Sequence, residues 1–225
     1  RYAPNTRLLV TVREPIQNCE SWLRTDFKKN DHDKCAHNLL AMLFGFDKVP
    51  FRLRETVGVR LEDLKARPKA TLKALSIWLG VKNSSTLYEM TAQGKKWWGD
   101  PTSPDYSKNK AMSPFDDAMT KRPVGTILSE KDQFVLGTLF YPFSVRFGYR
   151  EGDPEQFQKD LKEIRPLLDE MLDFERTMAE RLNTDHSQFK RSGSYQLLHA
   201  GMIDRWNVLN EFGDYPHILE PLSIA

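Results

Sequence analysis

The sequence predicts a helix-rich α/β fold with parallel strands. Residues 7–12 (RLLVTV) and 56–60 (TVGVR) are short apolar runs rich in β-branched side chains, as in strands buried in a parallel sheet. A segment with helical periodicity follows each run, and this order favours parallel pairing with right-handed crossovers. From residue 154 the pattern is helical and acidic, which predicts an α-helical extension over residues 151–225.

The first helix is predicted to begin at Pro15, because proline is favoured in the first turn of a helix. Ile16, Cys19, Leu23 and Phe27 recur at spacings of three and four, so they form one apolar stripe. We therefore expect this stripe to face the core. A second helix is expected from about residue 34 to residue 46.

Further helices are expected over residues 68–79, 129–147, 154–183 and 195–211. Leu72, Leu75 and Leu79 would form the core stripe of the first of these, which Gly80 should end. Pro142 should kink the second, whose phenylalanines are expected in the core. Residues 93–115 form a long polar loop, a length that usually indicates function or disorder.

The bulk composition is that of an ordinary globular protein. Hydrophobic residues make up 40% and charged residues 28% of the 225 positions. No apolar run approaches the roughly 20 residues that span a membrane. Two cysteines do not make a disulfide framework, so a reducing compartment is favoured and we predict a cytoplasmic protein.

Charge is distributed unevenly along the chain. Residues 1–150 carry a net charge of +9 and residues 151–225 a net charge of −7. A basic first part favours an anionic ligand, although a solvated surface would give the same count. The acidic helical tail could contact a protein partner or a further domain.

The clearest candidate site follows the first predicted strand. Arg13 stands where that strand ends, and parallel α/β sheets bind ligands at the carboxyl ends of their strands. A guanidinium can hold two phosphate or sulfate oxygens at once. Ser21 lies off the apolar stripe, on the same flank of the helix as Gln17 and Arg24. These four residues predict an anion site, while an ion-paired surface arginine beside a solvated serine is the alternative.

Three blocks in this order resemble the sulfotransferases that use 3′-phosphoadenosine 5′-phosphosulfate (PAPS). The resemblance implies the P-loop-NTPase-like three-layer fold of that family, over residues 1–150. It also implies that Arg13 and Ser21 hold the 3′-phosphate of PAPS. The blocks are VTVREP at residues 10–15 with Ser21, VRLEDL at residues 59–64 with Pro68, TL at 71–72 and WLG at 78–80, and residues 127–149, which end in FGY.

The same resemblance places a second basic contact to the 3′-phosphate at Lys95 and Lys96, followed by the Gly-Asp pair at residues 99–100. The family's 5′-phosphosulfate loop has no counterpart in the sequence, so we expect the chain to be the C-terminal portion of such an enzyme. The implied activity is sulfuryl transfer from PAPS to a hydroxyl or amine of a small-molecule or glycan-like acceptor, without a metal or nucleic acid. No catalytic base is assigned.

Two other functions fit the same strand–helix pattern. One is a P-loop kinase acting on a nucleotide or small molecule. The other is a degenerate, non-catalytic sulfotransferase domain that serves as an interaction module.

Three other patterns have structural interpretations. Residues 31–37 (DHDKCAH) look like a metal cluster, but Cys35 and His37 would point to different faces of a helix. Glu62 and Asp63 favour the start of a helix over a pair of catalytic carboxylates. Residues 191–194 (RSGS) are interpreted as a turn between helices.

Overall fold

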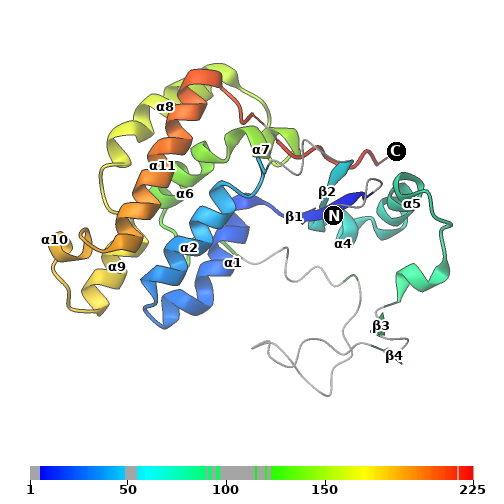
Figure 1. The fold of residues 1–225 in the computed structure, drawn as a ribbon, viewed down its shortest axis with the longest axis horizontal. Helices are drawn as coiled ribbons and strands as arrows, with labels where there is room; N and C mark the ends of the chain where they lie inside the picture. The colour runs from blue at the N-terminus through cyan, green and yellow to red at the C-terminus, as the bar shows by residue number, and fades with distance from the viewer. Residues whose placement is uncertain are drawn as a thin grey trace. The chain divides into compact units, whose positions relative to one another are not determined.

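A computed structural model describes residues 6–48, 55–89, 91–92, 95–96, 115, 120, 123–216 and 218–224. These residues form a helix-rich α/β fold with a small two-stranded parallel sheet, as the sequence predicts (Figure 1). The chain clusters into two compact units. The first unit contains residues 1–8, 13–56 and 123–220, and the second contains residues 9–12, 57–122 and 221–225. The division at residue 150 into a sulfotransferase-like domain and a helical extension stays a prediction.

The parallel sheet consists of β1 (Leu8–Val12) and β2 (Thr56–Arg60). The three central residues of β2 are buried, which confirms the expected buried strand. In β1 only Val12 is buried, so the same expectation is wrong for most of that strand. The difference follows from the positions of the two strands. β2 lies between β1 and residues 221–222, which pair with Gly58, whereas β1 lies at an edge of the described sheet.

Two helices follow β2. The helix α5 (Pro68–Leu79) has the predicted bounds, and its C-cap Gly80 has φ of 69°, a left-handed conformation that suits glycine. The predicted core stripe is wrong at Leu79, which is 40% exposed, whereas Leu75 is buried. The sequence did not predict α4 (Leu61–Ala66) as a separate six-residue helix. Glu62 and Asp63 lie in its first turn, which agrees with their interpretation as residues that favour the start of a helix.

The second unit also holds a short 3₁₀ helix, η1 (Ser85–Tyr88), and two two-residue strands. These strands, β3 (Thr91–Ala92) and β4 (Lys95–Lys96), pair antiparallel, with Thr91 opposite Lys96. β4 lies within the long polar loop predicted over residues 93–115, and β3 lies just before that loop. Most of that loop lies outside the described residues.

The first unit is a helical bundle. The predicted helix over residues 129–147 is divided at Phe140, two residues before Pro142, and the one predicted over residues 154–183 is divided between residues 167 and 173. Proline has no N–H to donate to the hydrogen bonds of a helix. Pro166 is the last residue but one of the helix that precedes this second division. The helices are α1 (Pro15–Lys28), α2 (His32–Leu43), α6 (Glu130–Leu139), α7 (Tyr141–Arg146), α8 (Pro154–Leu167), α9 (Asp173–Arg181), α10 (His186–Phe189) and α11 (Gly193–Phe212).

The core of the first unit is built on α2 and α11, which lie side by side (Figure 1). They run in the same direction, since His32 contacts Ser194 at one end and Leu43 contacts Arg205 at the other. Gly201 allows the close approach, because a Cβ at this position would come within 2.4 Å of a methyl carbon of Leu40. The predicted apolar stripe of α1 also packs in this core through Cys19, Leu23 and Phe27.

A buried arginine closes the far end of this pair. Arg205 is 1% exposed, and its Nη2 donates to the carbonyl oxygen of Leu43 at 2.7 Å and to Oδ2 of Asp47 at 2.8 Å. Leu43 is the last residue of α2, so Arg205 satisfies one of the carbonyls that a helix end leaves without a partner. The guanidinium also lies 4.1 Å from the ring centre of Tyr215.

Asp132, near the start of α6, holds the first turn of α9. Its carboxylate accepts the backbone N–H groups of Asp173 at 2.7 Å and Phe174 at 3.0 Å. Burial of the side chain raises the pKa of Asp132 to about 6, although the backbone hydrogen bonds act against this rise. The carboxylate is therefore ionised at neutral pH at a cost in stability.

This shift predicts a pH dependence of stability. The folded state holds the Asp132 proton up to about pH 6, whereas the unfolded chain releases it near its ordinary value of 3.8. The free energy of unfolding should therefore fall as pH rises from 4 to 6, by about 3 kcal/mol from this group. Urea denaturation of the parent and of Asp132→Asn across this range checks it. The stability of the parent relative to that of Asp132→Asn should fall by this amount as pH rises, whereas its stability relative to that of the exposed Asp204→Asn should show no such trend.

Candidate functional site

The predicted anion site lies at the start of α1. Arg13 is 8% exposed, and its Nε donates to Oε1 of Gln17 at 2.9 Å. The spacing of four residues places Gln17 one turn along from Arg13, and the contact fixes the direction of the guanidinium. The structure therefore brings two of the predicted site residues together.

Ser21 and Arg24 continue the same flank of α1 and are half-buried. Ser21 lies one turn after Gln17, and Arg24 almost one turn after Ser21. Lys95 and Lys96 form β4 in the second unit. Their side chains lie outside the described residues. The assignment of these residues to one anion site stays a prediction.

The sequence did not predict how the N-terminus of α1 is satisfied. The carboxylate of Glu14 accepts the N–H of Ile16 at 3.2 Å and of Gln17 at 2.6 Å, so the chain itself supplies the cap. An anion in this region would consequently be held by side chains and not by the first-turn amides of α1.

Glu20 fixes the other side of α1. It is 1% exposed and accepts three backbone N–H groups, from Gly125 at 2.9 Å, Thr126 at 2.7 Å and Ile127 at 3.2 Å. This carboxylate anchors the segment before α6 to α1, the helix that carries Ser21 and directly follows Arg13. A rigid helix is what a site of fixed geometry requires.

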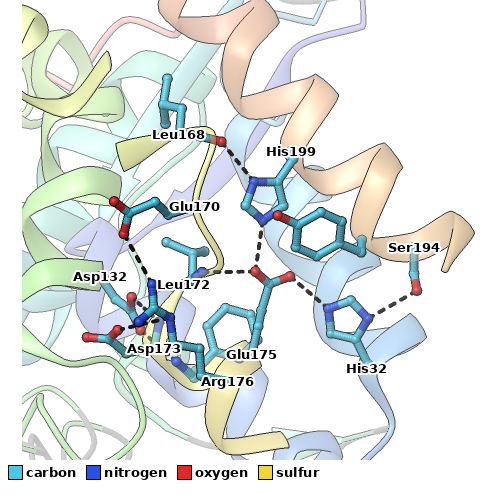
Figure 2. A network of polar contacts seen from close by, with 12 residues as sticks. His32, Asp132, Leu168, Glu170, Leu172, Asp173, Glu175, Arg176, Ser194 and His199 are labelled. Atoms are coloured by element: carbon cyan, nitrogen blue, oxygen red, sulfur yellow. Dashed lines mark hydrogen bonds and ion pairs between the residues drawn. The ribbon is translucent and has the colours of Figure 1, made fainter. Parts of the chain in front are cut away.

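A second constellation, in the first unit, was missed by sequence reasoning altogether. The carboxylate of Glu175 is fully buried and lies between two imidazoles, as Figure 2 shows. Its Oε1 is 2.9 Å from Nε2 of His32, and its Oε2 is 2.8 Å from Nε2 of His199. The backbone N–H of Leu172 donates to Oε2 at 3.0 Å. Helices α2, α9 and α11 each supply one of the three side chains.

The outer nitrogens of the two rings have different partners. Nδ1 of His199 lies 3.0 Å from the carbonyl oxygen of Leu168. Nδ1 of His199 thus faces a carbonyl oxygen, and its Nε2 faces a carboxylate oxygen of Glu175. Nδ1 of His32 lies 3.1 Å from the hydroxyl oxygen of Ser194, which can donate as well as accept. A neutral His32 therefore satisfies both of its contacts.

Burial alone would raise the pKa of Glu175, but hydrogen bonds from His199 and His32 and their positive charge hold it below its ordinary value. The carboxylate is ionised and lies between the two imidazoles.

A pocket of about 590 Å³ opens beside this network. Residues 29–33 line one side of it, and Leu182, Phe189, Ser192 and Ser194 are among those on the other. His32 and Ser194 thus belong both to the pocket wall and to the hydrogen-bonded network. The ring of Phe189 packs against His32 with their centres 4.6 Å apart.

Local signals position these residues. The side chain of Asp31 accepts the N–H of Lys34 and begins α2, which places His32 at its first position. The hydroxyl of Ser192 accepts the N–H of Tyr195 and begins α11, which places Ser194 at its second position. The turn predicted at residues 191–194 is confirmed at residues 191–192, whereas residues 193 and 194 belong to α11, which supplies Ser194.

The structural interpretation of residues 31–37 is confirmed at the two positions that it concerned. Cys35 is fully buried and His37 is exposed, so they face different sides of α2. Within the described ranges, no group of three His, Cys, Asp or Glu side chains could hold a metal ion. None of the helices described is long and apolar enough to cross a membrane.

Comparison with known proteins adds no assignment. No family model, no curated protein and no solved structure matches this chain.

Proposed function

We propose that this chain belongs to a PAPS-dependent sulfotransferase, with the P-loop-like three-layer fold of that class, and that it binds the 3′-phosphate of the donor. Arg13 carries the proposal. It is a largely buried arginine that follows a parallel strand directly, and Gln17 orients its guanidinium. Ser21 and Arg24 extend the same flank, and Lys95 and Lys96 supply further positive charge.

Binding of the 3′-phosphate contributes to catalysis because it positions the sulfuryl group of the donor. Sulfuryl transfer proceeds by attack of an acceptor oxygen or nitrogen on sulfur, while the S–O bond to the nucleotide phosphate breaks in line. Binding energy from a part of the donor that does not react fixes the sulfuryl group for this attack.

The test compares two nucleotides by isothermal titration calorimetry. Arg13→Ala should weaken binding of 3′-phosphoadenosine 5′-phosphate by roughly 10- to 100-fold, since hydrogen bonds to charged groups contribute about 1.5–3 kcal/mol. Adenosine 5′-phosphate lacks the 3′-phosphate, so the same substitution should leave its weaker binding almost unchanged.

Arg7→Ala is the matched control, because it removes one positive charge from an exposed arginine that pairs with Glu55. It should leave both affinities within about twofold. Equal losses for the two nucleotides would place Arg13 away from the 3′-phosphate. Magnesium-dependent binding of ATP in preference to the bisphosphate would favour a kinase, and binding of neither nucleotide would favour the interaction module.

A further inference from the structure

A series of three polar side chains in contact begins at the pocket beside α2 and α11. Ser194 Oγ lies 3.1 Å from His32 Nδ1, and the opposite nitrogen of that ring lies 2.9 Å from Glu175. A hydroxyl, an imidazole and a carboxylate in series are the parts of a nucleophile activated by an oriented base. We propose that Ser194, His32 and Glu175 form a second catalytic site, which hydrolyses small carboxylic esters.

The geometry of the His32 ring supports this role. In the neutral ring, a hydrogen on Nε2 that is donated to the carboxylate of Glu175 leaves the lone pair of Nδ1 toward the hydroxyl of Ser194. Ring contact with Phe189 limits rotation of the imidazole. His199 pairs with the same carboxylate and is itself fixed by Leu168, so it keeps Glu175 in place.

The surroundings of Ser194 fit an ester. Its hydroxyl lines a pocket of about 590 Å³, which is within the size range of small-molecule sites. Leu182 and Phe189 provide an apolar wall for an acyl chain. Gly193 and Ser194 occupy the first turn of the 20-residue α11, where backbone N–H groups have no partner within the helix and can stabilise an oxyanion. A Cβ on Gly193 would meet no atom within 4 Å, so there is open space at this position.

The reaction balances with water as the only co-reactant. Ser194 Oγ attacks the ester carbonyl carbon, and its proton passes to His32 Nδ1. The bond to the ester's alcohol oxygen then breaks, and the alcohol leaves with that proton. Water attacks the acyl-serine, gives a proton to His32 and releases the carboxylic acid, while Ser194 recovers its proton. Glu175 is a positioning residue throughout.

Covalent labelling tests the proposal directly. The whole chain is treated with diisopropyl fluorophosphate, and adducts are located by intact mass and peptide mapping. We expect one adduct on Ser194, no adduct in Ser194→Ala, and a labelling rate in His32→Gln at least 100-fold lower. Hydrolysis of 4-nitrophenyl acetate should fall in parallel in both variants.

Gln188→Ala is the matched control, because the exposed Gln188 lines the same pocket and takes no part in the serine, histidine and glutamate series, so this variant should still be labelled on Ser194. Glu175→Gln should shift the pH midpoint of labelling, which a merely structural role would not do. Absence of an adduct on Ser194, or labelling at the parent rate in His32→Gln, would overturn the proposal. Ser194→Ala removes only one partly exposed hydroxyl, so it decides the question even if the other variants do not fold.

The outcome is separable from that of the sulfotransferase proposal. Ser194→Ala should leave the affinity for 3′-phosphoadenosine 5′-phosphate unchanged. Arg13→Ala should in turn leave the labelling of Ser194 unchanged.

Discussion

Replacing Arg205 by methionine should lower the free energy of unfolding by about 3–5 kcal/mol, the typical cost of removing one partner from a buried ion pair. Arg205 is 1% exposed and contacts both the carbonyl of Leu43 and the carboxylate of Asp47. Methionine fills much of the same volume but cannot donate to either oxygen. Urea denaturation followed by circular dichroism measures the loss.

Two comparisons separate the lost contacts from lost bulk. Arg205→Lys keeps the charge but replaces the planar guanidinium over Tyr215 by a compact ammonium on a shorter side chain, so its loss should be intermediate. Arg191→Met removes an exposed arginine and should change stability by less than about 0.5 kcal/mol. A loss for Arg205→Met no larger than that of the control would mean that the buried contacts contribute nothing net to stability.

Glu175→Gln should be almost as destabilising, by about 2–4 kcal/mol. The carboxylate accepts hydrogen bonds from two imidazoles and from the N–H of Leu172. An amide can turn only one oxygen toward these donors, so at least one N–H is left buried without an acceptor. The exposed Glu180→Gln on the same helix removes an equal charge and should have little effect.

The pH dependence gives this prediction a second measurement. Because the pKa of Glu175 is held below its ordinary value of 4.5, its contribution is complete above that value and is lost as pH falls through the lowered pKa. The stability difference between the parent and Glu175→Gln should therefore shrink as pH falls below 4.5. A constant difference down to pH 2 would contradict the assignment of an ionised Glu175.

Local signals in the sequence were enough to place most elements. Pro68 and Gly80 mark the two ends of α5 because each acts through its own backbone, without reference to the rest of the chain. The six-residue α4 was missed because it is too short for a periodic pattern. Burial was harder to predict, as the 40% exposure of Leu79 shows, because it depends on neighbours that periodicity does not identify.

The candidate sites differ in the same way. Helical spacing predicts Gln17 on the same flank as Ser21 and Arg24, and the hydrogen bond from Arg13 to Gln17 spans only four residues. His32 and Glu175 are 143 residues apart in sequence, so no local pattern relates them. Glu20 was overlooked for the same reason, since the amides that it binds are more than 100 residues away.

The pairing of α2 with α11 has a consequence for synthesis of the chain. Leu43 and Arg205, which join the ends of this pair, are 162 residues apart, and residues 57–122 of the second unit lie between them. The ribosome adds roughly 5–20 residues per second, so synthesis of α11 comes on the order of ten seconds or more after synthesis of α2. During that time the apolar faces of α1 and α2 lack their partner, which makes the nascent chain a candidate substrate for chaperones. The second unit, by contrast, can begin to form while translation is still in progress.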